Sequence, residues 1–503
     1  MSNLYSHFKQ KLREQKKNII VTSHAKYTFT DINDFSAKLV QILLDLGMRQ
    51  GDRLAAQIEK SEYNIFLYLA CLRAGFIYLP LNNTYTHEEL DFFFNDAQPK
   101  VIICDIKNEK AIINIKSANN SCVKTLDAEG KGSLLETIKT KVSTEASEIY
   151  SVDPNETAVI LYTSGTTGKP KGAMITHQGL FSNAEDLLKT WGITDADSIL
   201  HVLPLFHVHG LFFALNTALL SGASTILLPK FHPDQFFKYL PKATVFMGVP
   251  TYYTRLINDE RLNQDQCKNM RLFISGSAPL LQSTFIEFES KTGHILLERY
   301  GMTETGINTS NPLEGSRKVG TVGLSLPSVN IRVVDDKDNA VPLNGIGNIQ
   351  VKGSNLFKGY WNNPDKTKEE FTEDGYFKTG DLGTLDDDRY LSIVGRSKDL
   401  VITGGLNVYP KEIELTIDSI DGVIESAVIG LPHTDFGEAV VAIVSGDENK
   451  LDEQLIIEIV KQNHAGYKCP KKVFFIDSLP KNTMGKVQKN ILREQFSKLF
   501  ITT

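Results

Sequence analysis

Cysteine is scarce in this sequence, and no two cysteines form a CxxC pair. Five occur among 503 residues, an odd number spread along the chain. This pattern argues against a disulfide framework and against a zinc cluster, and it favours a reducing, cytoplasmic compartment. The five are Cys71, Cys104, Cys122, Cys267 and Cys469.

A strong charge of one sign is also missing. Lys and Arg together number 54 and Asp and Glu 60, so the formal net charge is −6. A charge this small, and negative, argues against nucleic acid or an anionic membrane as the main partner. Composition does not predict an oligomeric state.

No uninterrupted apolar run suits a membrane span. Residues 199–229 contain no Asp, Glu, Lys or Arg, but proline, histidines and glycines interrupt them, so a buried strand–loop–helix–strand is expected. The basic segment 1–18 lacks the apolar core and cleavage site of a secretory signal. We expect a surface helix there with Leu4, Phe8 and Leu12 facing inward, and a short transit peptide is the alternative.

What the sequence does contain is an alternation of short β-branched runs and amphipathic helical segments, without a repeat or a low-complexity tract. This predicts an α/β fold with a large N-terminal body of layered α/β subdomains over residues 1–397. From about residue 320 the strands are short and separated by Asp, Asn and Gly turns, which predicts a β-rich subdomain. Residues 398–503 show a compact α+β pattern after a Gly-rich join, which predicts a small mobile C-terminal domain.

A loop rich in glycine and hydroxyl groups, YTSGTTGKPKG, spans residues 162–172. Glycines let backbone N–H groups surround an anion, while hydroxyls and lysines add donors, so the loop predicts a polyphosphate site. It is not a Walker A loop, because two residues instead of four separate Gly165 from Gly168, and Pro170 replaces the magnesium-binding Ser or Thr. A flexible surface turn is the alternative.

The loop resembles the signature loop of the adenylate-forming superfamily, which includes acyl-CoA synthetases, luciferases and the adenylation domains of peptide synthetases. Seven further segments follow in the family's order between residues 203 and 490: LPLFHVHGL, SGSAPL, RYGMTET, YFKTGDLG, GRSKD, GGLNVYPKEIE and PKNTMGKVQKN. The resemblance implies an AMP-forming acid–thiol ligase. In such an enzyme a carboxylate attacks the α-phosphate of ATP, and the thiol of CoA then displaces AMP from the acyl-adenylate.

The resemblance also implies the catalytic residues. Lys486 would reach the α-phosphate from the C-terminal domain, Thr303 would donate to the same phosphate, and Glu304 would bind Mg²⁺. Asp381 would accept both ribose hydroxyls, because a carboxylate has two acceptor oxygens. The implied ATP-binding set is Thr163, Ser164, Gly165, Thr166, Thr167, Gly168, Lys169, Gly276, Ser277, Ala278, Glu298, Tyr300, Gly301, Met302, Asp381 and Arg396.

For the second half of the reaction, the resemblance implies a rotation of the C-terminal domain about Lys398. Gly404 and Gly405 would then approach the CoA arm, and Lys468 would meet CoA phosphates. Acetylation of Lys486 by a lysine acetyltransferase would remove its charge and switch the enzyme off.

Two arginines predict the acyl group. Arg255 and Arg299 lie in segments that wall the acyl pocket in the family, where neutral residues are usual, and arginine recognises a carboxylate bidentately. With Ser277 and His207 they indicate a short diacid, and the local strings resemble those of malonate-activating members, which implies malonate and also methylmalonate. His207, at the carboxylate entrance, has a buried core histidine as its alternative. Three other functions stay open: another short-chain acyl-CoA synthetase, an enzyme that loads a carrier-protein thiol, and a nucleotide sensor without catalysis.

Overall fold

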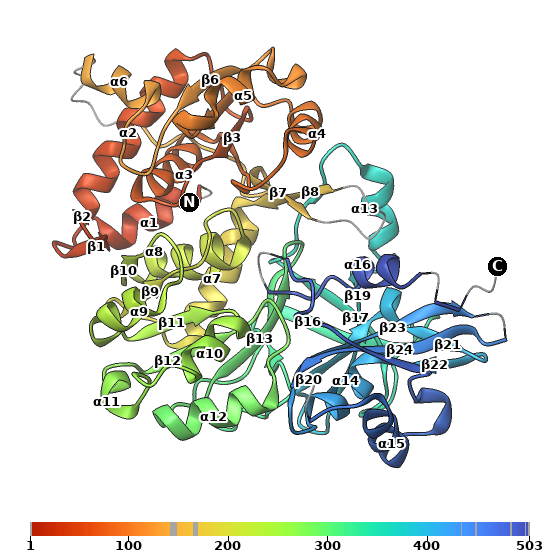
Figure 1. The fold of residues 1–503 in the computed structure, drawn as a ribbon. Helices are drawn as coiled ribbons and strands as arrows, with labels where there is room; N and C mark the ends of the chain where they lie inside the picture. The colour runs from red at the N-terminus through yellow and green to blue at the C-terminus, as the bar shows by residue number, and fades with distance from the viewer. Residues whose placement is uncertain are drawn as a thin grey trace.

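The computed structural model describes residues 3–140, 148–163, 170–433, 435–447, 450–482, 485–497 and 499–500 of the chain, without the side chains of 137–140. Within these residues it contains two large sheets built from the first 360 residues, a small antiparallel sheet, and a fourth sheet near the C-terminus (Figure 1). The predicted α/β class with a large body and a small α+β domain is confirmed.

The first large sheet has the order β18-β8-β7-β4-β3-β5-β6. β3 pairs in parallel with β4 and β5, whereas β7 and β8 are antiparallel. Its strands are β3 (Arg53–Gln57), β4 (Ile77–Pro80), β5 (Val101–Cys104), β6 (Cys122–Thr125), β7 (Thr157–Thr163), β8 (Lys171–Thr176) and β18 (Gly359–Tyr360). The helices of this region are α2 (Phe29–Asp45), α3 (Glu62–Ala74), α4 (His87–Ala97), α5 (Glu109–Ile113) and α6 (Ser133–Thr140).

Helix α3 shows how the sequence sets an element in this core. Ser61 caps its first turn by accepting a hydrogen bond from the backbone N–H of Asn64, and Gly75 ends it in the left-handed conformation at φ 68°. Nearly every residue between them is buried. The helix therefore packs on all sides, and α1 (Leu4–Leu12) packs against it. As predicted for α1, Leu4, Phe8 and Leu12 are buried.

The second large sheet has the order β15-β14-β13-β12-β11-β9-β10-β1-β2. Its central strands β9, β11, β12 and β13 pair in parallel, so their carboxyl ends meet at one edge. The strands are β1 (Asn18–Val21), β2 (Lys26–Thr28), β9 (Ser198–His201), β10 (Ser224–Leu227), β11 (Val245–Gly248), β12 (Leu272–Ser275), β13 (Leu297–Met302), β14 (Gly306–Ser310) and β15 (Leu324–Ser325). The helices of this region are α7 (His177–Trp191), α8 (Thr217–Ser221), α9 (Pro233–Tyr239), α10 (Pro250–Ile257), α11 (Gln264–Cys267) and α12 (Gln282–Thr292).

The charge-free segment 199–229 forms the predicted strand–loop–helix–strand unit. Between β9 and β10 the chain forms a π-helix over His209–Asn216, all of it buried, which continues into α8. A π-helix is rare and is frequent at functional sites. No helix among the described residues is long and apolar enough to cross a membrane.

The predicted β-rich subdomain is an antiparallel sheet of order β16-β17-β19-β20. Its strands are β16 (Val329–Val334), β17 (Gly347–Gly353), β19 (Phe377–Leu385) and β20 (Leu391–Arg396), and α13 (Pro364–Glu370) precedes β19. The proposed domain division at residues 397 and 398 falls directly after β20, in the 3₁₀ turn Ser397–Asp399.

The C-terminal sheet lies beside the β16–β20 sheet (Figure 1). Its path is β22-β21-β24-β23, and β25 pairs in parallel with β24. The elements are β21 (Val401–Thr403), β22 (Leu406–Val408), α14 (Pro410–Asp418), β23 (Val423–His433), β24 (Gly437–Gly446), α15 (Glu453–Asn463), β25 (Lys472–Phe475) and α16 (Lys489–Gln495). All five cysteines are free thiols, and the cytoplasmic compartment stays a prediction.

Candidate active site

The predicted site residues gather where several strands end. Residues 203–211 follow β9, residues 276–278 follow β12, and residues 303–305 form the turn between β13 and β14. Thr163 ends β7 of the other large sheet. Six residues of the predicted phosphate loop, Ser164, Gly165, Thr166, Thr167, Gly168 and Lys169, lie outside the described residues.

Glu304 is a buried carboxylate at the centre of this region, 6% exposed. Its Oε1 accepts hydrogen bonds from the hydroxyls of Thr163 at 3.4 Å and Tyr360 at 3.1 Å. No lysine or arginine among the described residues forms an ion pair with Glu304, and burial raises its pKa. Lys171 lies close by, with its ammonium over the Tyr360 ring at 4.6 Å. Neither Tyr360 nor Lys171 was predicted as a site residue.

Asp381 forms a second charged centre, on β19. Its Oδ1 pairs with Arg396 Nε at 2.8 Å, and its Oδ2 accepts a hydrogen bond from the Tyr300 hydroxyl at 2.6 Å. Asp381 and Arg396 face each other across the β19–β20 ladder, which explains why sequence segments fifteen residues apart act together. The Asp381 charge raises the pKa of Arg396, and burial followed by the Asp381 charge raises that of Tyr300.

The C-terminal domain brings Lys486 to this second centre. Four charged groups influence the pKa of the Lys486 ammonium. They are Asp381 and Arg396 from the body and Lys398 and Asp399 from the join. Crowding by protein, followed by the Arg396 charge, lowers the pKa of Lys486 to about 8. Its side chain is nevertheless exposed, so protein surrounds the ammonium without closing over it. Lys486 therefore lies within the electrostatic reach of Asp381 and Arg396, and its role in the first half of the reaction stays a prediction.

Backbone contacts fix the turn that carries Lys486. The Lys486 N–H donates to Asn482 Oδ1 at 3.0 Å, and the Gly485 N–H donates to the Asn482 carbonyl at 2.9 Å. A Cβ on Gly485 would lie 3.1 Å from Thr251 of α10, so this turn meets the body closely.

The turn around β13 holds the remaining predicted nucleotide residues. Gly301 and Met302 pair with Ile307 and Gly306 across the β13–β14 hairpin, and Thr303 opens the turn between these strands. Burial raises the pKa of Glu298 to about 8, against the lowering effect of Lys411 on α14 of the C-terminal domain. Glu298 therefore lies near the domain boundary, and its role in binding ATP stays a prediction.

Arg299 is a buried arginine without a carboxylate partner among the described residues. It is 4% exposed, its Nη2 donates to Ser277 Oγ at 3.4 Å, and its guanidinium lies over the Phe213 ring at 5.3 Å. Its Nε has no hydrogen-bond partner. Burial lowers the pKa of Arg299 to about 9. A Cβ on Gly276 would lie 2.4 Å from the Arg299 guanidinium carbon, so any side chain there would require the guanidinium to move.

His209 completes this cluster, and it was not predicted. Its Nδ1 lies 3.2 Å from Ser277 Oγ, while its buried Nε2 has no partner. Because Ser277 accepts from Arg299, its own hydroxyl can donate to His209 Nδ1, which leaves the proton of the neutral ring on Nε2. Burial and the Arg299 charge lower the pKa of His209 well below its ordinary value, so the ring is neutral. Among the described residues the cluster therefore presents two buried nitrogens without a hydrogen-bond partner: Arg299 Nε, a donor, and His209 Nε2, a donor in the tautomer in which Ser277 donates to Nδ1.

Ser277 and Ala278 follow β12 as predicted, and Ser277 has a positive φ of 76°, which is rare outside glycine. His207 accepts a hydrogen bond from the His209 N–H at 3.2 Å through Nδ1, and burial followed by the Arg299 charge lowers its pKa to about 4. Arg255 lies elsewhere: it is exposed in the last turn of α10, and no described contact joins it to Arg299. Its role in binding substrate stays a prediction.

The residues predicted for CoA lie on the C-terminal domain. Gly404 and Gly405 form the tip of the β21–β22 hairpin at φ 57° and 78°, and a Cβ on either would meet nothing within 4 Å. Lys468 pairs with Glu412 of α14 at 2.5 Å. Lys398 lies in the 3₁₀ turn after β20, where the hinge was predicted. These roles stay predictions.

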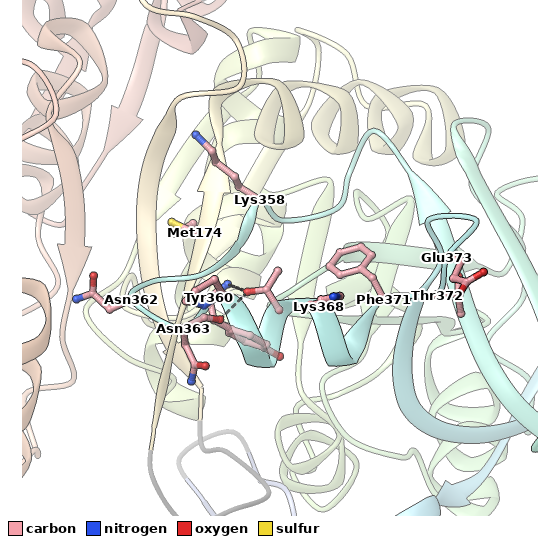
Figure 2. A pocket seen from close by; sticks show the side chains of 11 residues that line it. Met174, Lys358, Tyr360, Asn362, Asn363, Lys368, Phe371, Thr372 and Glu373 are labelled. Atoms are coloured by element: carbon pink, nitrogen blue, oxygen red, sulfur yellow. Dashed lines mark hydrogen bonds between the residues drawn. The ribbon is translucent and has the colours of Figure 1, made fainter.

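A cavity of about 690 Å³ lies beside the region around Glu304 and does not include Glu304 (Figure 2). Tyr360 reaches both, because its ring lines the cavity while its hydroxyl donates to Glu304. The cavity is lined from β8, β18 and α13 by Met174, Lys358, Tyr360, Asn362, Asn363, Pro364, Thr367, Lys368, Phe371, Thr372 and Glu373. None of the predicted site residues that the structure describes lines it.

Comparison with known proteins agrees with this arrangement. Residues 8–361 match the family described as AMP-binding enzyme, and residues 412–486 match its C-terminal domain. A malonate–CoA ligase of Arabidopsis thaliana is 38% identical over 89% of this chain and 78% of its own length. The long-chain-fatty-acid–CoA ligase FadD13 of Mycobacterium tuberculosis is 32% identical over 95% of this chain and 94% of its own.

The solved structures include MatB from Rhodopseudomonas palustris, which is 48% identical over 99% of this chain and 100% of its own. The TM-score is 0.96 against its ATP-bound structure and 0.85 against its apo structure. The arrangement of this chain therefore matches the ATP-bound form of MatB more closely.

Proposed function

The chain belongs to the AMP-binding enzyme family, and within this family we propose that it is an ATP-dependent malonate–CoA ligase. The proposed reaction passes through a malonyl-adenylate and releases pyrophosphate and AMP. Methylmalonate is the proposed second substrate.

The observation that carries this proposal is Arg299. A buried cation without a carboxylate partner is costly, because its hydration is lost and nothing replaces it. A dicarboxylate offers the missing partner: one carboxylate reacts, and the other accepts from Arg299 Nε and His209 Nε2. The uncharged tail of acetate or a fatty acid would leave the cation unpaired. The malonate–CoA ligase relative supports the same substrate.

For adenylation, the residues around Asp381 would orient ATP. The two carboxylate oxygens of Asp381, which now bind Arg396 and Tyr300, would accept hydrogen bonds from the vicinal ribose hydroxyls in place of these partners. Lys486 and Thr303 would donate to the α-phosphate, where negative charge increases as the carboxylate attacks. Holding these donors in place before the reaction lowers the barrier without reorganisation of water.

Mg²⁺ fits the residues around Glu304. The described residues contain no group of three or more His, Cys, Asp or Glu side chains that could hold a metal ion by themselves. Magnesium commonly binds through one or two carboxylates, water and substrate phosphates, and Glu304 supplies one carboxylate that forms no ion pair with the described lysines and arginines. The bound ion would neutralise phosphate charge, while Thr163 and Tyr360 hold the carboxylate oriented.

For thiolysis, Lys486 would leave so that the CoA thiol can reach the acyl carbon. A rotation near Lys398 would bring Gly404 and Gly405 toward the site in its place. Lys468 would need to leave Glu412 to meet a CoA phosphate.

The direct test is AMP release with ATP, Mg²⁺, CoA and a panel of acids. Malonate is expected to give the highest kcat/KM, with methylmalonate second and acetate, propionate and octanoate far lower. A higher rate with acetate or octanoate would contradict the diacid assignment. Replacing CoA by a phosphopantetheinyl carrier protein separates the ligase from a carrier-loading enzyme, and pyrophosphate exchange without turnover would indicate a nucleotide sensor.

A further inference from the structure

Lys60 is a lysine that the reaction outlined above does not use. It lies in the connection between β3 and α3, at the carboxyl end of the first large sheet, and it is partly buried. Its partner is not a carboxylate. Its amino group donates to Nδ1 of His201 at 2.9 Å and to the carbonyl oxygen of the same residue at 2.9 Å, and burial lowers the pKa of Lys60 well below its ordinary value. His201 ends β9 of the second large sheet, so Lys60 joins the two sheets at their carboxyl ends.

The bond from Lys60 fixes the state of His201. On its other side, His201 Nε2 lies 2.9 Å from the carbonyl oxygen of Gly210. A carbonyl only accepts, so Nε2 carries the proton and Nδ1 of the neutral ring accepts from Lys60. Burial and the Lys60 charge both lower the pKa of His201 well below its ordinary value, which keeps the ring neutral.

His201 in turn closes the loop of residues 202–210. The loop leaves β9 directly after His201 and returns to the His201 side chain at Gly210, in the first turn of the π-helix. The return is tight, since a Cβ on Gly210 would lie 2.1 Å from the Pro204 carbonyl oxygen. His207 and His209 lie inside this closed loop, and His209 contacts Ser277 beside Arg299.

We propose that Lys60 is a positioning residue for the acyl pocket, acting through His201 on the loop that carries His207 and His209. This inference rests on the proposed function, because it takes Arg299, Ser277 and His209 as the site of the distal carboxylate. Loss of the Lys60 bonds would let the His201 ring turn and release the Gly210 carbonyl. The donors at His209 would then lose their alignment with Arg299, whereas the nucleotide residues Asp381 and Arg396 would keep theirs.

The test compares Lys60→Met with wild type in steady-state AMP release, varying malonate and ATP separately. Because burial lowers the pKa of Lys60 well below its ordinary value, its two bonds to His201 are taken at about 0.5–1.5 kcal/mol each, the range for uncharged groups, so we expect the KM for malonate to rise about 5- to 100-fold. The KM for ATP should change less than ~2-fold, within the scatter usual for independent sites. Lys318→Met is the matched control, because it removes an ammonium bound to Asp386 and Asp388 at 2.6 and 2.7 Å, outside the acyl pocket.

A second substitution distinguishes positioning from a general loss of stability. His201→Leu removes both bonds of the His201 side chain, the one to the Gly210 carbonyl and the one from Lys60, and leaves only the bond from Lys60 to the backbone carbonyl. In that background Lys60→Met should raise the malonate KM by no more than ~2-fold, since the two residues act as one unit. Equal rises in the KM for malonate and ATP, multiplicative effects of the two substitutions, or a wild-type KM in Lys60→Met would each overturn the inference.

Two further outcomes are interpreted separately: a Lys60→Met variant that does not fold, and a wild type that does not activate malonate. If Lys60→Met does not fold, Lys60→Gln, which retains an uncharged donor on a shorter side chain, carries the same expectations. If the wild type does not activate malonate, the proposed function fails, and the Lys60 comparison is then made with the acid that the wild type does activate. A selective rise in the KM for that acid would support the positioning role, and its absence would refute it.

Discussion

Replacing Arg299 by methionine should lower the activity with malonate and raise the stability of the ligand-free protein. Arg299 has no carboxylate partner among the described residues and is 4% exposed. Burial lowers its pKa from the ordinary value of an arginine to about 9. That change corresponds to roughly 5 kcal/mol for holding the charge in place, as an order of magnitude. Methionine has a similar length and no charge, so we expect the ligand-free variant to be more stable by about 1–4 kcal/mol, with a melting temperature several degrees higher.

The same substitution should remove the recognition of the second carboxylate. Taking away one member of a buried charge pair costs about 3–5 kcal/mol, which corresponds to roughly 2 to 3.5 decades in kcat/KM for malonate. Activity with propionate, which lacks the second carboxylate, should stay constant or rise. The assays are AMP release with both acids and thermal unfolding without ligand.

Arg271→Met is the matched control. Arg271 pairs with Asp197 at 2.7 Å, and Asp197 is buried, so this substitution leaves a carboxylate without its partner. It should lower the melting temperature and leave the preference for malonate over propionate unchanged. The reasoning would be refuted if Arg299→Met lowered the melting temperature as Arg271→Met does, or kept the malonate preference.

Three further predictions concern the nucleotide side of the site. Lys486→Ala should abolish adenylation, measured by pyrophosphate release, yet leave thiolysis of preformed malonyl-adenylate largely intact, and an equal loss in both would contradict the use of Lys486 in one half only. The pKa of Lys486 is lowered to about 8, and the protonated form is the active one. The kcat/KM for adenylation should therefore be constant below pH 8 and fall as the pH rises through 8. Lys486→Arg should remove this alkaline decrease, and a decrease that persists would exclude Lys486 as the titrating group. Asp381→Asn removes the charge that pairs with Arg396, so the KM for ATP should rise about 10- to 100-fold while malonate selectivity is kept, and calorimetric ATP binding equal to wild type would contradict this role.

The sequence predicted the elements of the site better than their contacts. Asp381 and Glu304 were selected by motif order; Asp381 was expected just after a strand, but the structure places it within β19, and it places Glu304 in the turn between β13 and β14. His209 and the bond between Lys60 and His201 were not predicted. Lys60 and His201 are 141 residues apart, and no local pattern reports a contact between the ends of two different sheets.

The exposure of Arg255 could have been predicted from the helical periodicity of its segment. The buried residues of α10 are Pro250, Tyr253, Leu256 and Ile257, which recur at helical spacing. Arg255 falls between them on the exposed face, so helical periodicity alone separates it from Arg299, which lies on a buried strand. The two arginines share a residue type and a motif context, but only one has the burial that recognition of a single carboxylate needs.

The charges around Lys486 also predict that electrostatic attraction to ATP favours closure of the C-terminal domain over the site. In the described arrangement its ammonium lies near two further cations, Arg396 and Lys398, and near the carboxylates of Asp381 and Asp399. Repulsion and crowding lower its pKa, whereas the phosphates of ATP would add negative charge and favour the closed arrangement. Lys486→Met removes one of three cations, so it should increase closure without ATP and reduce the further closure that ATP causes, as measured by small-angle scattering. A variant that stays open without ATP, or closes with ATP as wild type does, would show that the closing force lies elsewhere.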